Sequence, residues 1–115
     1  MTSDYRSAGR TTLTPDVLLT IARQAALEVE GVHGMAAVKG GVDRMLWRGN
    51  DGVRIKMEDD NVLIDLYLVV KSDVNLREVS RNVQVKVARA IAEMTGLEVG
   101  HVDIHIEDVY YQPES

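Results

Sequence analysis

The residues best suited to carry chemistry lie near the C-terminus, in the stretch VGHVDIHIEDV at residues 99–109. Imidazole and carboxylate side chains alternate there with aliphatic ones, at His101, Asp103, His105 and Glu107. Side chains of these types bind zinc and iron and act as general acids and bases. The stretch therefore raises the hypotheses of a metal site and of an acid–base site, beside the simpler one that it is the polar face of a strand.

The spacing of these residues argues against a metal site built by the strand alone. Side chains two positions apart on a strand are separated by about 6.6 to 6.8 Å, so His101 and His105 would lie roughly 13 Å apart. Ligands would have to come from adjacent strands, where Arg54 and Lys56 would repel a cation. We predict no metal, no cofactor and no catalytic residue, and keep a metal-binding protein or enzyme that uses His101, Asp103 and His105 as the alternative.

A second group of acids and imidazole follows the first predicted helix, at Glu28, Glu30 and His33. Acids in a last helical turn oppose the helix dipole, at a cost of about 0.3 kcal/mol or more each. Local rules are sometimes broken in this way at functional sites. The favoured interpretation is nevertheless solvent-exposed acids before a glycine cap.

The second predicted helix has a basic outer edge, formed by Arg77, Arg81, Lys86 and Arg89. Such an edge would suit an acidic partner or a phosphate backbone. Interleaved glutamates on the same helix allow ordinary pairing along it, so a solvated face is favoured.

Length and composition bound the class of protein. A chain of 115 residues is enough for one domain. The absence of cysteine excludes disulfides, thiolate zinc sites and cysteine nucleophiles. No apolar run approaches the ~18 residues of a membrane span, and a formal charge of −5 gives no overall attraction to nucleic acid or anionic lipid. We expect a cytoplasmic protein without direct membrane insertion and without nucleic acid as a partner.

Hydrophobic periodicity predicts the elements that would position these residues. In chain order they are a helix at 14–30, a short strand at 34–38, a loop at 39–51, a hairpin of strands 53–58 and 61–71, a helix between Asn75 and Gly96, and a strand at 98–108. The first helix would bury Val17, Leu18, Ile21, Ala22, Ala25 and Val29. The second would bury Leu76, Val79, Val83, Val87, Ile91 and Met94.

The hairpin has one register that satisfies both of its faces. A two-residue turn at Asp59-Asp60 pairs Met57 with Val62, Ile55 with Ile64 and Val53 with Leu66 on one face. On the other face the same register places Arg54 across from Asp65, an opposite-charge pair.

Two amphipathic helices can cover one face of a small sheet. We therefore predict a two-layer α/β (α+β) sandwich with the order α-β-β-β-α-β, in which a three- to four-stranded mixed sheet carries both helices on one face. The domain would span residues 13–109, between a disordered N-terminal tail at 1–12 and a C-terminal tail at 110–115.

The uncovered face of this sheet would carry apolar side chains at Leu63, Tyr67 and Val69. Apolar surface of this kind marks contact sites. Trp47, the single tryptophan, would pack on the core as a lid or mark a contact surface. We predict these four residues as a partner or oligomer interface.

Three stretches of the chain resemble the alkaline shock protein family of bacterial envelope-stress proteins, at residues 21–35, 52–70 and 82–109. The most specific motifs are E-V-x-G-V-x-G-M after the first helix, Val-Gln inside the second helix and M-T-G-L before the last strand. The resemblance covers about residues 14–109. It departs from the family at Leu46-Trp47-Arg48 and at Lys71-Ser72, where a tyrosine-glycine pair is common. Both departures lie in predicted loops, where they would change partner specificity rather than the fold.

The resemblance implies a small, acidic, cytoplasmic protein without enzymatic activity. Such a protein would act as a scaffold in cell-envelope homeostasis and stress response, through self-association and a membrane-anchored partner, itself expected to be a family member. It would lie near the membrane only through that partner. The resemblance brings no catalytic residue to this chain.

A small RNA-binding module is a further hypothesis, because a helix-covered sheet of this size also binds RNA. The chain has no GXXG loop or stacking-aromatic motif, and its charge is of the wrong sign. The histidines have another expected role: since imidazoles titrate near neutral pH, His101 and His105 would make an oligomer contact sensitive to pH.

Overall fold

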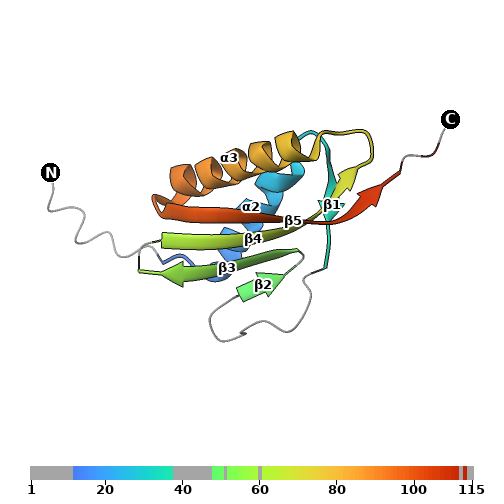
Figure 1. The fold of residues 1–115 in the computed structure, drawn as a ribbon. Coiled ribbons are helices and arrows are strands. Elements are labelled where there is room, and N and C mark those ends of the chain that lie inside the picture. The colour runs from blue at the N-terminus through green and yellow to red at the C-terminus, as the bar shows by residue number, and fades with distance from the viewer. Residues whose placement is uncertain (1–11, 38–47, 51, 60, 112, 114–115) are drawn as a thin grey trace, which may run out of the picture.

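The computed structural model describes residues 12–37, 48–50, 52–59, 61–111 and 113. In chain order its elements are α2 (Pro15–Leu27), β1 (Val32–Met35), β2 (Arg48–Asn50), β3 (Val53–Glu58), β4 (Asn61–Lys71), α3 (Leu76–Thr95) and β5 (Glu98–Tyr110), as Figure 1 shows. The predicted fold class, a two-layer α+β sandwich with the order α-β-β-β-α-β, is confirmed, and one further short strand, β2, precedes the hairpin.

Strand β4 lies at the centre of the sheet. Strand β5 pairs with it in parallel along its whole length, as expected for two strands joined by a helical crossover. On its other side β4 pairs with β3 through residues 61–66 and with β1 through residues 68–70, both antiparallel. The sheet is mixed, as predicted, but with β2 beyond β3 it has five strands among the described residues rather than the predicted three or four.

The ends of β1 and β3 meet at Tyr67. The Tyr67 amide donates to the carbonyl oxygen of Gly52 at 2.8 Å, and its own carbonyl accepts from the amide of Ala36 at 2.8 Å. Gly52 has a φ of 84°, and a Cβ added to it would lie 2.6 Å from the Ala36 carbonyl oxygen. Only glycine fits this close approach of three strands.

The hairpin of β3 and β4 has the predicted register at every position. Its pairs are Val53 with Leu66, Arg54 with Asp65, Ile55 with Ile64, Lys56 with Leu63, Met57 with Val62, and Glu58 with Asn61. The alternation of apolar and polar residues on both strands fixes this register, because a slip of one residue would turn the apolar set away from the core.

Helix α2 begins at the predicted place but ends early. Pro15 occupies its first turn, where a missing N–H costs no hydrogen bond, and Thr14 is the N-cap residue without a side-chain cap bond. The helix ends at Leu27 rather than at residue 30. A turn closed by Gly31, at a φ of 102°, leads into β1, and the Gly31 carbonyl accepts from the amide of Lys71. The prediction that Val17 is buried is wrong, since it is 41% exposed in the first turn.

Helix α3 has both predicted ends. The side chain of Asn75 accepts a hydrogen bond from the Glu78 amide at 3.0 Å, and Gly96 closes the helix in the left-handed conformation. The prediction that Leu76 and Met94 are buried is wrong, because these terminal turns extend past the core and leave them 45% and 70% exposed. The core face of α3 comes from the turns between them.

Three strands differ from the prediction. Strand β1 covers residues 32–35 rather than 34–38, and the last strand continues to Tyr110, into the predicted C-terminal tail. Strand β2 lies within the predicted loop 39–51, where a three-residue strand is too short to show a period. The rest of that loop before β2, including Trp47, and nearly all of the predicted N-terminal tail lie outside the described residues.

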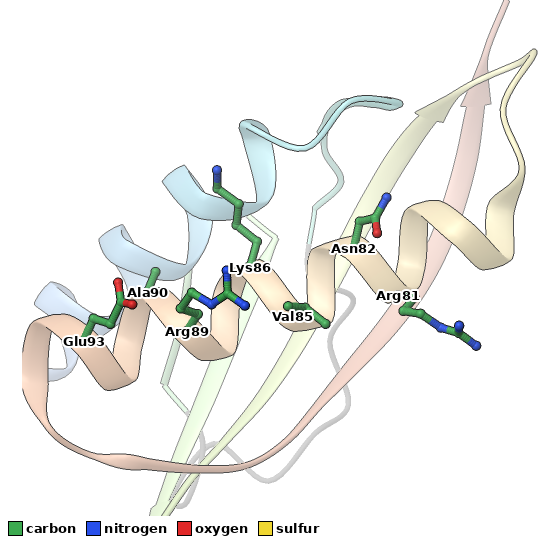
Figure 2. A pocket seen from close by; sticks show the side chains of 7 residues that line it. All are labelled: Arg81, Asn82, Val85, Lys86, Arg89, Ala90 and Glu93. Atoms are coloured by element: carbon green, nitrogen blue, oxygen red, sulfur yellow. The ribbon is translucent and has the colours of Figure 1, made fainter.

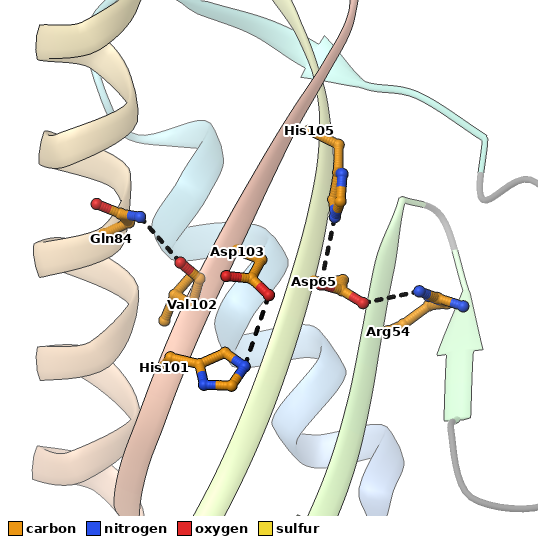
Figure 3. A network of polar contacts seen from close by, with 7 residues as sticks. All are labelled: Arg54, Asp65, Gln84, His101, Val102, Asp103 and His105. Atoms are coloured by element: carbon orange, nitrogen blue, oxygen red, sulfur yellow. Dashed lines mark hydrogen bonds and ion pairs between the residues drawn. The ribbon is translucent and has the colours of Figure 1, made fainter. Parts of the chain in front are cut away.

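One core joins the two layers. It is formed by the inner faces of α2 and α3 and the sheet residues beneath them, among which Val53, Val62, Ile64, Leu66, Leu68, Val70, Val83, Val87 and Ile91 are fully buried. Figures 1 and 3 show α2 across one face of the sheet and α3 alongside the outer edge of β5. The other face carries no helix among the described residues, and the side chains that alternate with the core project from it.

Candidate interaction surface

We call the face of the sheet without helices the open sheet face. The side chains on this face include a buried ion pair. Arg54 of β3 and Asp65 of β4 are 9% and 6% exposed, and the Arg54 Nη2 lies 2.7 Å from the Asp65 Oδ2 (Figure 3). They are cross-strand partners, as predicted from the register. A buried pair of this kind gives little net stability but strongly disfavours any register that separates its members.

The same carboxylate reaches the third strand. The other oxygen of Asp65, Oδ1, lies 3.3 Å from the Nε2 of His105 in β5. The imidazole of His105 stacks on the ring of Tyr67, with centroids 4.5 Å apart and planes 13° from parallel. The guanidinium of Arg54 lies 5.5 Å from the centroid of the same ring. These four side chains form one network across β3, β4 and β5, which we call the Asp65 network.

The predicted interface is only partly accessible. Tyr67 is 8% exposed, so the expectation that it presents apolar surface is wrong. It is buried because it packs between His105 of β5 and Arg54 of β3. The residue pattern of β4 alone does not indicate contacts with these neighbouring strands. Leu63 and Val69, to either side of Tyr67 on β4, are half-buried and remain accessible. Leu63 also lies against the backbone of β5, where a Cβ added to Gly100 would be 2.8 Å from its Cδ2.

The four ionisable residues of β5 do not converge. His101 pairs with Asp103, Nε2 to Oδ2 at 3.5 Å, on the exposed part of the strand. His105 turns instead to Asp65 on the neighbouring strand (Figure 3). The described residues contain no group of three or more His, Cys, Asp or Glu side chains that could hold a metal ion.

The acids and imidazole after the first helix are also dispersed. Glu28 pairs with Lys86 of α3, at 3.2 Å between Oε1 and Nζ, and so links the two helices. His33 stacks on Tyr110 at the end of β5, with centroids 3.8 Å apart. Glu30 is exposed. The structure therefore gives these residues separate roles rather than one site.

Two features of α3 were not predicted as a site. Gln84 donates from its Nε2 to the carbonyl oxygen of Val102 at 2.9 Å, and so joins the helix to β5. The outer face of the helix borders a hollow of about 450 Å³ (Figure 2), lined by Arg81, Asn82, Val85, Lys86, Arg89, Ala90 and Glu93. The sequence signal for this hollow is the basic outer edge of the helix, for which the charge pattern favours a solvated face. The helices of the described part of the chain include none that is long and apolar enough to cross a membrane.

The fold is similar to that of solved structures of low sequence identity. A structure described as MamM-CTD H285A superimposes with a TM-score of 0.53 at 13% identity, over 83% of this chain and 98% of that one. A second, MamM CTD H264E, gives a TM-score of 0.51 at 13% identity, over 81% and 93% of the two chains. These similarities concern the fold alone.

Relatives in sequence come from Bacillus subtilis and Streptococcus pyogenes. The uncharacterized protein YloU of Bacillus subtilis is 31% identical over 106 residues, which is 88% of each chain. The uncharacterized protein YqhY of the same organism is 31% identical over 110 residues, or 93% of this chain and 82% of the relative. The uncharacterized protein Spy1614 of Streptococcus pyogenes is 31% identical over 102 residues, or 84% of each.

A family model covers nearly the whole chain and agrees with the motifs quoted from the sequence. It matches residues 3–111 and describes the alkaline shock protein family, with a cell envelope-related function. The resemblance to the alkaline shock proteins is thus confirmed, and the chain belongs to the alkaline shock protein family.

Proposed function

We propose that this protein is a non-enzymatic scaffold in cell-envelope homeostasis, which acts in the cytoplasm through self-association and through a membrane-anchored protein partner. Membership of a family with a cell envelope-related function supports the cellular role. The observation that supports protein binding is the open sheet face, where the accessible Leu63 and Val69 lie on β4 to either side of the buried Asp65 and Tyr67.

The Asp65 network suits a rigid binding surface. Asp65 contacts Arg54 with one oxygen and His105 with the other, so its two oxygens are engaged within the chain. Stacking on Tyr67 holds the imidazole of His105 in place. Because Arg54, Asp65 and Tyr67 are already buried and ordered, a partner that covers the accessible Leu63 and Val69 would order few further side chains. This is the property expected of a preformed interface rather than of a group that must move during a reaction.

Self-association is tested by sedimentation velocity over a wide range of protein concentration. The wild-type chain should show a mass that rises with concentration above the 12.8 kDa of one chain. Leu63→Asp and Val69→Asp should each shift the association to at least about tenfold higher concentration, because a carboxylate would be desolvated at the interface. Met94→Asp, at the exposed end of α3, is the matched control and should associate like the wild type.

A monomer at every concentration would contradict self-association, and equal losses in all three variants would contradict the open sheet face as its site. Circular dichroism should confirm that each variant is folded. The membrane-anchored partner is tested separately, by fractionation of cells that express the wild type. The protein should sediment with membranes and be released by mild detergent, and recovery entirely in the soluble fraction would contradict this part of the proposal.

A further inference from the structure

A line of arginines runs along the outer face of α3. Arg77, Arg81, Val85 and Arg89 follow one another at intervals of four residues, so they share one face of the helix. All four are exposed, and Val85 is 49% exposed although it is aliphatic. We call these four residues the arginine ridge.

The arginine ridge lacks carboxylate partners within the described part of the chain. None of its arginines has an ion pair within 4.0 Å there, whereas Lys86 on the same helix pairs with Glu28. Like charges four residues apart, such as Arg77 and Arg81, destabilise a helix by about 0.2 to 0.5 kcal/mol. The whole chain nevertheless carries five more acidic than basic side chains. Glu78 and Glu93 also line the surface beside the ridge but form no ion pair with its arginines within 4.0 Å, so the three guanidinium groups are left available to carboxylates of a partner.

The surface beside the arginine ridge is hollowed rather than flat. The hollow of about 450 Å³ extends from Arg81 to Glu93, with Val85 and Arg89 on its lining (Figure 2). A second hollow of about 230 Å³, lined by Asn75, Arg77, Glu78 and Arg81, continues it toward the start of the helix. Arg81 borders both, so the two hollows follow the ridge along the helix.

We propose that the arginine ridge binds an acidic amphipathic helix of a protein partner. The helical rise from Arg77 to Arg89 is about 18 Å, or a little over three turns. Carboxylates repeated at turn intervals on a partner helix would match this spacing, and guanidinium groups bind carboxylates in a two-point geometry. An aliphatic side chain of the partner would cover the exposed Val85. A flat lipid surface would leave the hollows unfilled. This inference rests on the proposed function in treating the protein as a binding module, but it uses a different surface.

The test uses the full chain and a labelled helical peptide of about 18 residues. The peptide carries glutamates at positions i, i+4 and i+12 and a leucine at i+8, which repeats the spacing of the ridge. Fluorescence anisotropy should show saturable binding that weakens as salt is raised. Arg81→Glu combined with Arg89→Glu should weaken binding at least about tenfold, and Val85→Asp should also weaken it. The matched control, Lys56→Glu with Lys71→Glu, makes the same charge change on the sheet and should bind like the wild type.

Several results would overturn the proposal. These are no saturable binding, equal loss in the two double variants, or a peptide of the same composition in scrambled order binding as well as the designed one. Tighter binding to phosphatidylglycerol vesicles than to the peptide, abolished by the same α3 reversals, would assign the ridge to lipid instead. Sedimentation of the same variants separates this inference from the proposed function. If a strictly monomeric wild type binds the peptide, self-association is contradicted and the ridge is supported. If the wild type self-associates but does not bind the peptide, only the proposal for the ridge is contradicted.

Discussion

Gln84 of α3 donates a hydrogen bond to the backbone carbonyl of Val102 on β5 at 2.9 Å, on the side of the strand away from β4 (Figure 3). Among the described strands, β5 lies at an edge of the sheet, and edge strands leave a row of backbone groups without strand partners. The contact satisfies one of these groups and anchors the helix beside the edge. The Val-Gln motif that resembles the family in the second helix therefore has a structural role, in which Val83 enters the core and Gln84 binds the strand.

Replacing Gln84 by Leu should lower the free energy of unfolding by about 1 kcal/mol, the typical net value of one such hydrogen bond. Urea denaturation measures the change. Gln24→Leu, on the exposed side of α2, is the matched control and should change stability by no more than about 0.5 kcal/mol. If the two variants were equally stable, the contact would contribute nothing to the fold.

Arg54→Met should be far more destabilising, because it leaves the carboxylate of Asp65 buried without its closest cation. Breaking a buried pair from one side costs about 3 to 5 kcal/mol. The double variant Arg54→Met with Asp65→Leu removes the buried charge as well and should recover most of the loss. Denaturation of the single and double variants gives both values, and a double variant no more stable than the single one would contradict this account of the pair.

The hairpin could be predicted completely because its information is local. Apolar and polar residues alternate along both β3 and β4. The opposite charges of Arg54 and Asp65 require the same register as the apolar pairs do. The burial of Tyr67 could not be predicted in this way. It depends on His105 from a strand distant in sequence and on the meeting of β1 with β3, and neither appears in the pattern of β4 itself.

The sequence predicts which residues lie on the candidate site better than it predicts which residues they contact. Leu63 and Val69 stand on the open sheet face as expected, since strand alternation decides the face of each residue. Parallel pairing places Asp65 opposite Asp103, with His101 and His105 two residues to either side, so the register alone does not decide which histidine contacts Asp65. In the structure His105 contacts Asp65, whereas His101 contacts Asp103. Helical periodicity predicted the face of Met94 but not where the core ends along α3.

Gly31 and Gly34 should respond in opposite ways to alanine. Gly31 has a φ of 102°, and a Cβ there would lie 2.7 Å from the Cγ2 of Val79. Gly31→Ala should therefore lower stability by about 1 to 3 kcal/mol. Gly34 has no atom within 4 Å of an added Cβ, so Gly34→Ala should be neutral within about 0.5 kcal/mol. Thermal denaturation of the two variants compares them, and equal effects would show that neither the conformation nor the contact matters at Gly31.

Truncation along α3 should locate the limit of the core. Ile91 is fully buried, whereas Met94, three residues later, is 70% exposed. Ile91→Ala removes buried methyl and methylene groups and leaves a cavity, so it should cost about 2 to 5 kcal/mol. Met94→Ala should cost no more than about 0.5 kcal/mol in the isolated chain, because its side chain loses little contact and alanine favours the helix. Chemical denaturation at low protein concentration keeps self-association from adding to either value. A cost for Met94→Ala close to that of Ile91→Ala would mean that this end of α3 is covered in solution.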